Sequence, residues 1–459
     1  LWSRGLGDVY KRQIICYIIS ATMFIGTRNA DYSLLFFEPL LFGICYHFNK
    51  TLKQKKFTHI ALGILFVTSL VKYVITPFVY FLANYPIVEM MIGKEYLEKA
   101  IILQCYEEVC FFIVLKYAAN KFYSKEVTEK SSIKKRIYAQ HHNPFLVFFV
   151  IVAIAIIVTT PSMISRYHFV GSLVGNEEAN IVEMEGTGGL ALLIGTGRYF
   201  LILLLLAYIY NRRKIHRTID VILSIGIVAL NSLVVYDFSR FGIIIPAATF
   251  IYLITLLYPQ NRKRIIVFSL MAIGISIVYI SILKMFSEFR GGNIEDSSSI
   301  QYWAKTLQVY FQGTSDVAVG LIASKRAVLD PIMSFFNDCI SNVAVLSNFS
   351  VKQQTSLYIF NYIRSGGVSF DKILPNICAG YNYFGAIGAP VIVCICTYFG
   401  IKLDSMSRKV RDINYKFIFI FASITLALCH MIYYTMIVSG LVNSALIMLI
   451  VLRLNKLFK

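Results

Sequence analysis

Arginine side chains are the residues of this 459-residue chain best suited to hold a phosphate, because a guanidinium group can bind two phosphate oxygens at once. Arg240 lies between two long apolar runs in VVYDFSRFGIIIPAATFIYLI, residues 234–254, where a charge is costly. Two interpretations are open for it. The side chain either contacts a lipid-linked phosphate, or reaches the membrane interface and helps to end one helix and begin the next. Asp237 lies in the same polar break.

Arg198 is a second charged group in an apolar setting, about halfway along IGTGRYFLILLLL. An ionisable side chain at that position usually faces a polar cavity or a partner. Gly195 and Gly197 leave room for the close approach of a neighbouring helix or headgroup. A functional role and a structural ion pair are both open. Candidate acidic partners within apolar runs are Glu38, Glu107 and Glu108.

A long polar segment, residues 285–381, supplies further groups that could bind a charged sugar donor. Arg290 and Arg364 are cations suited to a pyrophosphate. Tyr310 and Tyr381 are aromatic residues suited to packing against sugar rings. Each of these residues alone is also consistent with an ordinary loop, so their combination in one segment carries the interpretation.

The elements that must position these groups are membrane helices. The chain is 57% hydrophobic and 15% charged, with a mean hydropathy of +0.66. A soluble protein carries roughly 25% charged residues. Apolar runs of about 18 residues or more recur, each long enough to cross a bilayer as a helix. A barrel would need alternating strands of about ten residues, so the sequence predicts an all-α, polytopic integral membrane protein.

The apolar runs predict about twelve transmembrane helices, within a range of ten to twelve. About nine of them fall in a first membrane portion, residues 14–284, and about three in a second, residues 382–459. The predicted spans are 14–27, 33–48, 59–82, 101–118, 143–160, 188–210, 218–235, 241–258, 265–284, 382–400, 416–435 and 437–453.

Basic residues predict the orientation of these helices, because positive charge gathers in cytoplasmic connections. Every second connection is basic, so both termini are expected on the cytoplasmic side. The basic connections and tail are 50–56, 121–136, 212–217, 262–264, 402–411 and 453–459. The long segment 285–381 then faces outward, and we expect it to form a partly helical external cap.

Several classes of function are disfavoured by what the sequence lacks. The formal charge of +19 lies in short connections between apolar runs and forms no nucleic-acid-binding module. No metal-ligand spacing and no HExxH, GxSxG or phosphate-loop motif is present, so no metal and no cofactor are expected. Cys339 and Cys378 share the long segment, where two free thiols or a disulfide are the alternatives.

The first residues require a separate interpretation. SRGLGDVYKRQ, residues 3–13, resembles one translated frame of a sequencing adapter, and no initiator Met precedes it. We interpret residues 1–13 as an artefact of this kind; an ordinary basic N-terminus is the alternative.

Three stretches resemble the Wzy-type polymerases, which join the oligosaccharide repeat units of bacterial surface polysaccharides. DFSRFGIIIPAATFIYLI is similar to the span led by Ser-Arg in that family. VYFQGTSDVAVGLIAS is similar to its Gly-centred segment in the long loop. PNICAGYNYFGAIGAPVIVCICTYFG is similar to its Asn and Phe-Gly pattern after the loop. The family's loop pattern of Arg followed ten residues later by Gly is absent after Arg166, Arg290 and Arg364.

The resemblance implies lengthening of a glycan linked to undecaprenyl pyrophosphate, in which a sugar hydroxyl attacks an anomeric carbon and the lipid pyrophosphate leaves. Arginine would stabilise charge on the leaving group. The candidates for phosphate contact, in falling order, are Arg240, Arg198, Arg290 and Arg364. A carboxylate could assist the attacking hydroxyl. The candidates for this base are Asp371, Asp237 and Glu288.

The resemblance also implies a location and partners. The chain would lie in the bacterial cytoplasmic membrane, in contact with the lipid bilayer and the lipid-linked oligosaccharide. A chain-length regulator and a flippase are the protein partners that such a role implies.

Two other functions remain open. A flippase for lipid-linked oligosaccharides would share the span count and the basic interior face, but would need no external cap. An O-antigen-type ligase typically uses a His in its large external loop, and residues 285–381 contain no His.

Overall fold

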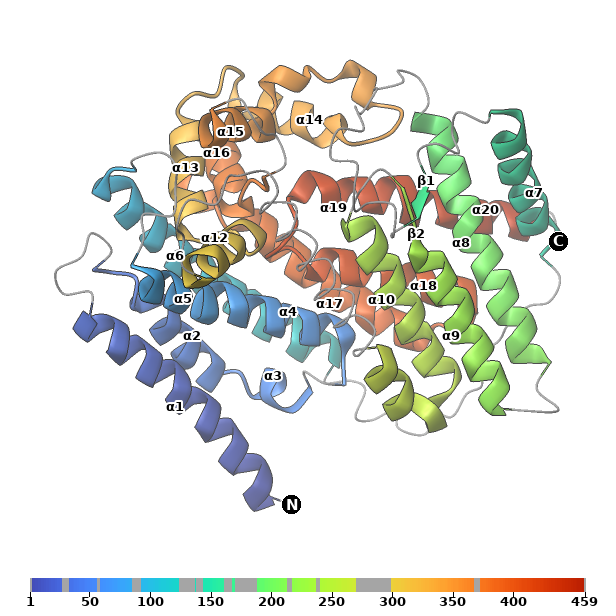
Figure 1. Cartoon of the computed structure of the whole chain (residues 1–459), viewed down its shortest axis with the longest axis horizontal. Helices are drawn as coiled ribbons and strands as arrows, with labels where there is room; N and C mark the ends of the chain where they lie inside the picture. The colour runs from blue at the N-terminus through green and yellow to red at the C-terminus, as the bar shows by residue number, and fades with distance from the viewer. Residues whose placement is uncertain are drawn as a thin grey trace. The chain divides into compact units, whose positions relative to one another are not determined.

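Helices make up nearly all of the described chain (Figure 1), which confirms the all-α class. The exceptions are two three-residue strands, β1 (Tyr167–Phe169) and β2 (Val234–Tyr236), which pair antiparallel. The computed structural model describes residues 2–26, 33–55, 58–84, 92–123, 137, 143–160, 167–169, 188–212, 217–236, 240–269, 299–366 and 372–457.

The chain divides into two compact units, each assembled from segments that are distant in sequence. Unit 1 comprises Leu1–Lys130, Ser297–Ser405 and Thr425–Ser439. Unit 2 comprises Ser131–Asp296, Met406–Ile424 and Gly440–Lys459. The last three unit boundaries fall within helices α17 (Val391–Lys409), α18 (Ile413–Ala427) and α19 (Tyr434–Gly440).

Unit 1 is built from the N-terminal part of the sequence and from segments of its second half. Its other elements are α1 (Trp2–Gly26), α2 (Phe37–His47), α3 (Lys50–Lys55), α4 (Ile60–Leu70), the π-helix η1 (Val71–Ile75), α5 (Thr76–Ala83), α6 (Lys94–Tyr123), α12 (Ser299–Tyr310), α13 (Thr314–Ser324), α14 (Pro331–Ser341), the short η6 (Ser347–Phe349) and η7 (Lys352–Gln354), α15 (Ser356–Ser365) and α16 (Asn376–Gly388).

Unit 2 contains the strand pair and a second set of apolar helices. Its other elements are α7 (Pro144–Thr159), α8 (Gly188–Asn211), α9 (Arg217–Leu233), α10 (Arg240–Leu257), the 3₁₀ turn η5 (Pro259–Asn261), the π-helix η8 (Leu441–Leu446) and α20 (Ile447–Leu457). The sequence predicts helix as far as residue 235, whereas the chain after Leu233 is extended and pairs with β1.

Three helical segments of the described chain are long and apolar enough to cross a membrane: Ile60–Ala83, Gly189–Asn211 and Tyr434–Leu457. Two bent pairs raise the number to five if each pair is one span. These pairs are Phe241–Leu257 with Pro259–Ser269, and Asn376–Gly388 with Val391–Lys409. A helical membrane protein is therefore supported, and the count of about twelve spans remains a prediction.

Helix α13 lies in the interior of unit 1, although its sequence belongs to the segment expected to form an external cap. Nine of its eleven residues are buried. It packs against α6, α15 and α16, and the last two lie beside it in Figure 1. That the whole segment 285–381 forms an external cap remains a prediction.

The break between α16 and α17 results from small residues and a proline. A Cβ on Gly380 would meet the carbonyl oxygen of Ala389 at 2.0 Å, so only glycine permits this approach of the two backbones. Gly385 has φ +70°, a left-handed conformation that glycine adopts without steric cost. Pro390 then begins the second helix, which is bent by 103° from the first.

Candidate functional site

Lys72 is a fully buried cation within the longest apolar segment of unit 1. It lies in the π-helix η1, where the N–H of Thr76 bonds to the carbonyl of Val71, five residues back. Pro77 follows directly; it has no N–H, and in a regular helix its ring would collide with the carbonyl four residues before it. The widened turn avoids this collision, and single π turns of this kind are frequent at functional sites.

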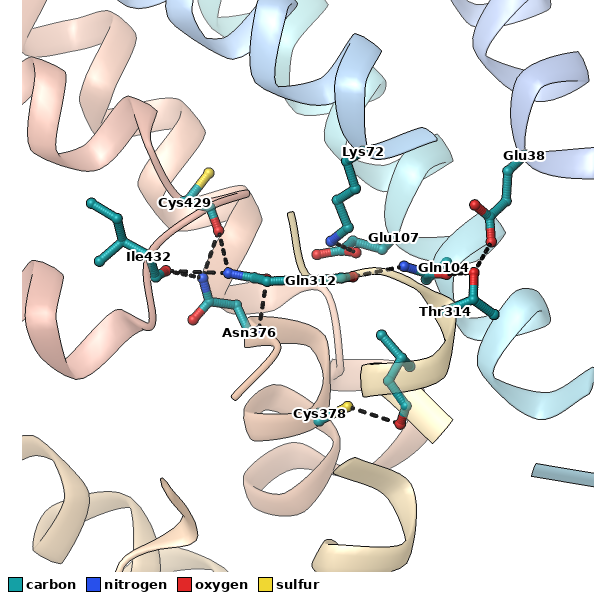
Figure 2. A network of polar contacts seen from close by, with 11 residues as sticks. Glu38, Lys72, Gln104, Glu107, Gln312, Thr314, Asn376, Cys378, Cys429 and Ile432 are labelled. Carbon is teal, nitrogen blue, oxygen red and sulfur yellow. Dashed lines mark hydrogen bonds and ion pairs between the residues drawn. The ribbon is translucent and has the colours of Figure 1, made fainter. Parts of the chain in front are cut away.

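Helix α6 presents four interacting side chains on one face. Gln104, Glu107, Glu108 and Phe111 follow the spacing i, i+3, i+4 and i+7, which places them together on a helix. All four are fully buried. The Nζ of Lys72 lies 2.7 Å from the Oε2 of Glu107, and this ion pair is drawn in Figure 2.

Two further groups complete what we call the charge cluster, defined as Glu38, Lys72, Glu107, Glu108 and His430. Glu38 is in the first turn of α2, and His430 follows α18. Both are fully buried. His430 packs edge-to-face against the rings of Tyr73, at 5.6 Å, and Phe111, at 4.7 Å. The cluster therefore places three carboxyl groups and an imidazole beside one lysine.

The turn between α12 and α13 connects to this cluster through a chain of hydrogen bonds (Figure 2). The hydroxyl of Thr314 lies 3.1 Å from Oε1 of Glu38 and 2.8 Å from Oε1 of Gln104. The Nε2 of Gln104 donates to the carbonyl of Gln312 at 3.0 Å. Gln312 itself has φ +54°, which is costly for a residue with a side chain. A Cβ on Gly313 would meet Oε1 of Gln308 at 2.0 Å, so any larger residue there would displace the Gln308 side chain.

Gln312 and Asn376 together hold the break between α18 and α19. The backbone N–H of Asn376 donates to Oε1 of Gln312 at 3.0 Å. The Nδ2 of Asn376 donates to the carbonyls of Cys429 and Ile432, at 2.6 and 2.8 Å. The Nε2 of Gln312 lies within 3.4 Å of the same two oxygens. Two amide side chains thus bind carbonyls that the broken helix leaves unpaired.

A second buried ion pair lies in the same unit. The Nε of Arg364, in α15, lies 2.6 Å from Oδ1 of Asp316, in α13. Burial raises the pKa of Asp316, and the Arg364 guanidinium opposes that shift. Among the described residues, Nη2 of Arg364 and Oδ2 of Asp316 have no hydrogen-bond partner.

Asp338, in α14, forms a third polar group with tyrosines. Its Oδ1 accepts from the backbone N–H of Ser356 at 2.9 Å, and its Oδ2 accepts from the hydroxyls of Tyr383 and Tyr433. Tyr434 donates to Tyr383 at 3.0 Å. Burial raises the pKa of Asp338, whereas its hydrogen bonds lower it. The arrangement combines a carboxylate with aromatic surfaces.

The sequence-predicted Arg198 has an amide partner. Its Nε and Nη2 donate to the side-chain and backbone oxygens of Asn231, in α9 of unit 2. The sequence also leaves an acidic partner open for Arg198, and one candidate for that role, Glu107, pairs with Lys72. A Cβ on Gly197 would meet that of Ala153 in α7 at 2.5 Å, which confirms the expected close approach at Gly197; a Cβ on Gly195 would meet nothing within 4 Å.

The other sequence-predicted residues are placed unevenly. Helix α10 begins at Arg240, as expected, but nothing is described of that side chain. Arg364 forms the ion pair with Asp316. Tyr310 ends α12, two residues before Gln312, and Tyr381 lies in α16, five residues after Asn376. Both side chains are half-buried. The predicted residues outside the described ranges are Asp237, Glu288, Arg290 and Asp371.

Cysteine and metal predictions can be tested in part. Cys339 and Cys378 are both free thiols, so the disulfide alternative is not realised. Within the described ranges, no three His, Cys, Asp or Glu side chains are placed to hold a metal ion.

Sequence reasoning missed Lys72, His430 and Asp338. Lys72 carried a usable signal, because an ionisable residue inside a predicted span is by default a candidate functional group. His430, in the predicted span 416–435, carried the same signal. Asp338 carried none, since its tyrosine partners come from 45 and 95 residues further along the chain.

Comparison with known proteins identifies no relative. The chain matches no protein-family model, and no curated protein or solved structure matches it at a significant level.

Proposed function

We propose that this protein joins lipid-linked oligosaccharide repeat units into a surface polysaccharide on the outer face of a bacterial cytoplasmic membrane. The proposal rests on the resemblance of three stretches to Wzy-type polymerases and on the helical membrane class of the chain. An undecaprenyl pyrophosphate donor needs no nucleotide, because the pyrophosphate is already a leaving group.

One observation in particular supports this proposal. Two of the three resembling stretches, residues 309–324 and 375–400, meet inside unit 1. Gln312 from the first accepts the backbone N–H of Asn376 from the second at 3.0 Å. Cys378 Sγ also lies 3.4 Å from the carbonyl of Val317. Two separate stretches that each resemble part of a Wzy-type polymerase are thus in contact inside unit 1.

The proposed glycosyl transfer requires a cation at the leaving pyrophosphate and a base at the attacking hydroxyl. Arg240, Arg198, Arg290 and Arg364 remain the cation candidates in that order. For the base, Asp338 joins the sequence candidates Asp371, Asp237 and Glu288, because it is a carboxyl group held in place by the hydroxyls of two tyrosines.

Glycan chain length in a deletion strain tests the proposal. We expect single repeat units on the acceptor in the absence of the protein, and long chains on complementation with the unchanged gene. Asn376→Ala, at equal protein abundance, should restore only short chains, because it removes three hydrogen bonds between the second stretch and residues 429–434. Gln353→Ala is the matched control, since Gln353 is exposed in the same segment. Long chains in the deletion strain would refute the proposal.

Arg240 has a separate test. Arg240→Ala should shorten the chains if its guanidinium contacts the lipid pyrophosphate. Chains of normal length at normal protein abundance would remove Arg240 from the site.

A transporter of lipid-linked oligosaccharide is the second candidate, and the charge cluster favours it. Buried carboxyl groups inside transport proteins commonly serve as proton relays. The same deletion strain separates the two functions: a transporter defect traps repeat units on the cytoplasmic side, whereas a polymerase defect leaves single units on the acceptor.

A further inference from the structure

The charge cluster cannot be fully ionised as it stands. Glu38, Glu107 and Glu108 would bring three negative charges, and Lys72 brings one positive charge, while all four side chains are fully buried. An unpaired carboxylate in such surroundings is expensive, and it becomes neutral by taking up a proton. Glu107 has the Lys72 ammonium at 2.7 Å. The excess protons therefore belong to Glu38 and Glu108.

The hydrogen bonds of Thr314 indicate that Glu38 carries one of these protons. The Nε2 of Gln104 donates to the Gln312 carbonyl, which fixes Oε1 of Gln104 as the acceptor facing Thr314. Oε1 of Glu38 faces the same hydroxyl at 3.1 Å. Thr314 has a single hydrogen and cannot donate to both oxygens. Both contacts are hydrogen bonds only if Glu38 carries a proton and donates to Thr314, which then donates to Gln104.

The cluster also contains unsatisfied groups that can exchange this proton. Neither ring nitrogen of His430 and neither carboxyl oxygen of Glu108 has a hydrogen-bond partner among the described residues. Oε2 of Glu38 and Oε1 of Glu107 likewise lack one. Buried polar atoms are usually hydrogen-bonded, so this number in one place needs an explanation.

We propose that the charge cluster is a proton-binding site, with the proton on Glu38 controlling the hydrogen bonds of the Gln312–Thr314 turn. When Glu38 loses its proton, the Thr314 hydrogen turns to the carboxylate, and Oε1 of Gln104 loses its donor. Gln104 is the side chain that binds the Gln312 carbonyl, so the turn loses part of its support. The site is independent of whether the protein polymerises or transports glycans.

Other titratable groups face the cluster from each element around it. They are Cys16 on α1, Cys45 on α2, Tyr73 on η1, Cys105 and Cys110 on α6, Cys378 on α16, Cys394 on α17 and Cys429 beside His430. Asp316, on α13, has Arg364 as its own partner. Thiols and the phenol are neutral at neutral pH unless something stabilises their anions, so the carboxyl groups account for proton exchange there.

Infrared difference spectroscopy on the purified full-length protein tests the proposal. At neutral pH, Glu38→Gln should remove a carbonyl-stretch band of a protonated carboxylic acid, and this band should shift in D₂O. Glu95→Gln is the matched control: Glu95 is 72% exposed and pairs with Lys99, so its loss should remove only carboxylate bands. A carboxylate difference at Glu38, like that at Glu95, would overturn the proposal.

Two further measurements do not depend on the folding of Glu38→Gln. Thr314→Val removes the acceptor of the Glu38 proton, so the acid band should move to the frequency of a carboxylic acid whose O–H is not hydrogen-bonded, whereas Thr314→Ser should leave it in place. An unchanged band in Thr314→Val would contradict the assignment. The unaltered protein should keep the band when KCl is replaced by NaCl. Loss of the band in NaCl would show a site for sodium rather than for a proton.

Discussion

Unit 1 contains two buried ion pairs that look alike by distance and differ in their surroundings. Lys72 and Glu107 are 2.7 Å apart, and Arg364 and Asp316 are 2.6 Å apart. The second pair is balanced, with one cation for one anion. The first has two more carboxyl groups and a histidine beside it. A short, buried ion pair therefore does not by itself reveal a role; the charges around it do.

The two ion pairs also differ in their cation, which is arginine in one pair and lysine in the other. Arginine keeps its proton under all ordinary conditions, so Arg364 always offers Asp316 a counter-charge, which opposes the rise that burial causes in the pKa of Asp316. Lysine can change its protonation state when buried. The balanced pair thus suits a permanent connection between α13 and α15, whereas the Lys72 pair lies where protons can be redistributed.

The largest effect is expected from breaking the balanced pair. Asp316→Leu leaves the Arg364 guanidinium buried, charged and unpaired, and should lower the free energy of unfolding by about 3–5 kcal/mol. Thermal unfolding in detergent, with size exclusion for the folded fraction, measures this. The double variant Asp316→Leu/Arg364→Met should recover most of the loss, because apolar replacement of a whole buried pair is often neutral. Failure to recover would give the pair a role beyond the fold.

Lys72→Met should have a smaller effect, because Glu107 can take up a proton and become neutral. We expect a loss of about 1–3 kcal/mol in the free energy of unfolding near neutral pH. Folding then binds a proton that the unfolded chain lacks, so the deficit should grow as the pH rises. Melting curves of Lys72→Met and of Lys72→Met/Glu107→Gln across pH give the check. A deficit that is independent of pH in the single variant would mean that Glu107 needs no proton.

Arg198, in unit 2, differs from both ion pairs because it donates hydrogen bonds to a neutral amide, Asn231. Arg198 is half-buried and donates to Asn231 through two nitrogens. Asn231→Ala removes the side-chain acceptor but keeps the backbone one, so we expect a loss of about 1 kcal/mol in the free energy of unfolding. If glycan chain length falls while stability does not, Arg198 has a role outside packing.

The helical class was predictable because it depends on local properties. The lengths of the apolar runs and the scarcity of charge are visible in any window of the sequence. The start of α10 at Arg240 follows from a polar break between two such runs. Gly197 in an apolar helix predicted a close neighbour, and Ala153 supplies it.

The candidate site was less predictable because its contacts join distant segments. Gln104 and Gln312 are 208 residues apart, and Glu38 and Thr314 are 276 apart. No periodicity connects them. Arg198 illustrates the same limit: the sequence predicted a polar partner, but only the packing of α9 against α8 selects Asn231.

The smallest effect, and the one with the opposite sign, is expected at Glu108. Its two oxygens have no hydrogen-bond partner among the described residues, although the side chain is fully buried. Glu108→Gln removes a group that must otherwise bind a proton, and its amide can donate to the free oxygens of Glu38 or Glu107. We expect a change between zero and about 1 kcal/mol of added stability, measured by thermal unfolding.

Asp316→Asn is the matched control for that change, because it makes the same carboxylate-to-amide replacement in the balanced pair. It leaves Arg364 without a counter-charge and should destabilise the protein. Stability changes of opposite sign in the two variants would show that the Glu108 carboxyl group is not needed for stability, whereas that of Asp316 is. Equal losses would mean that Glu108 is ionised and paired, and the distinction between the two buried ion pairs would fail.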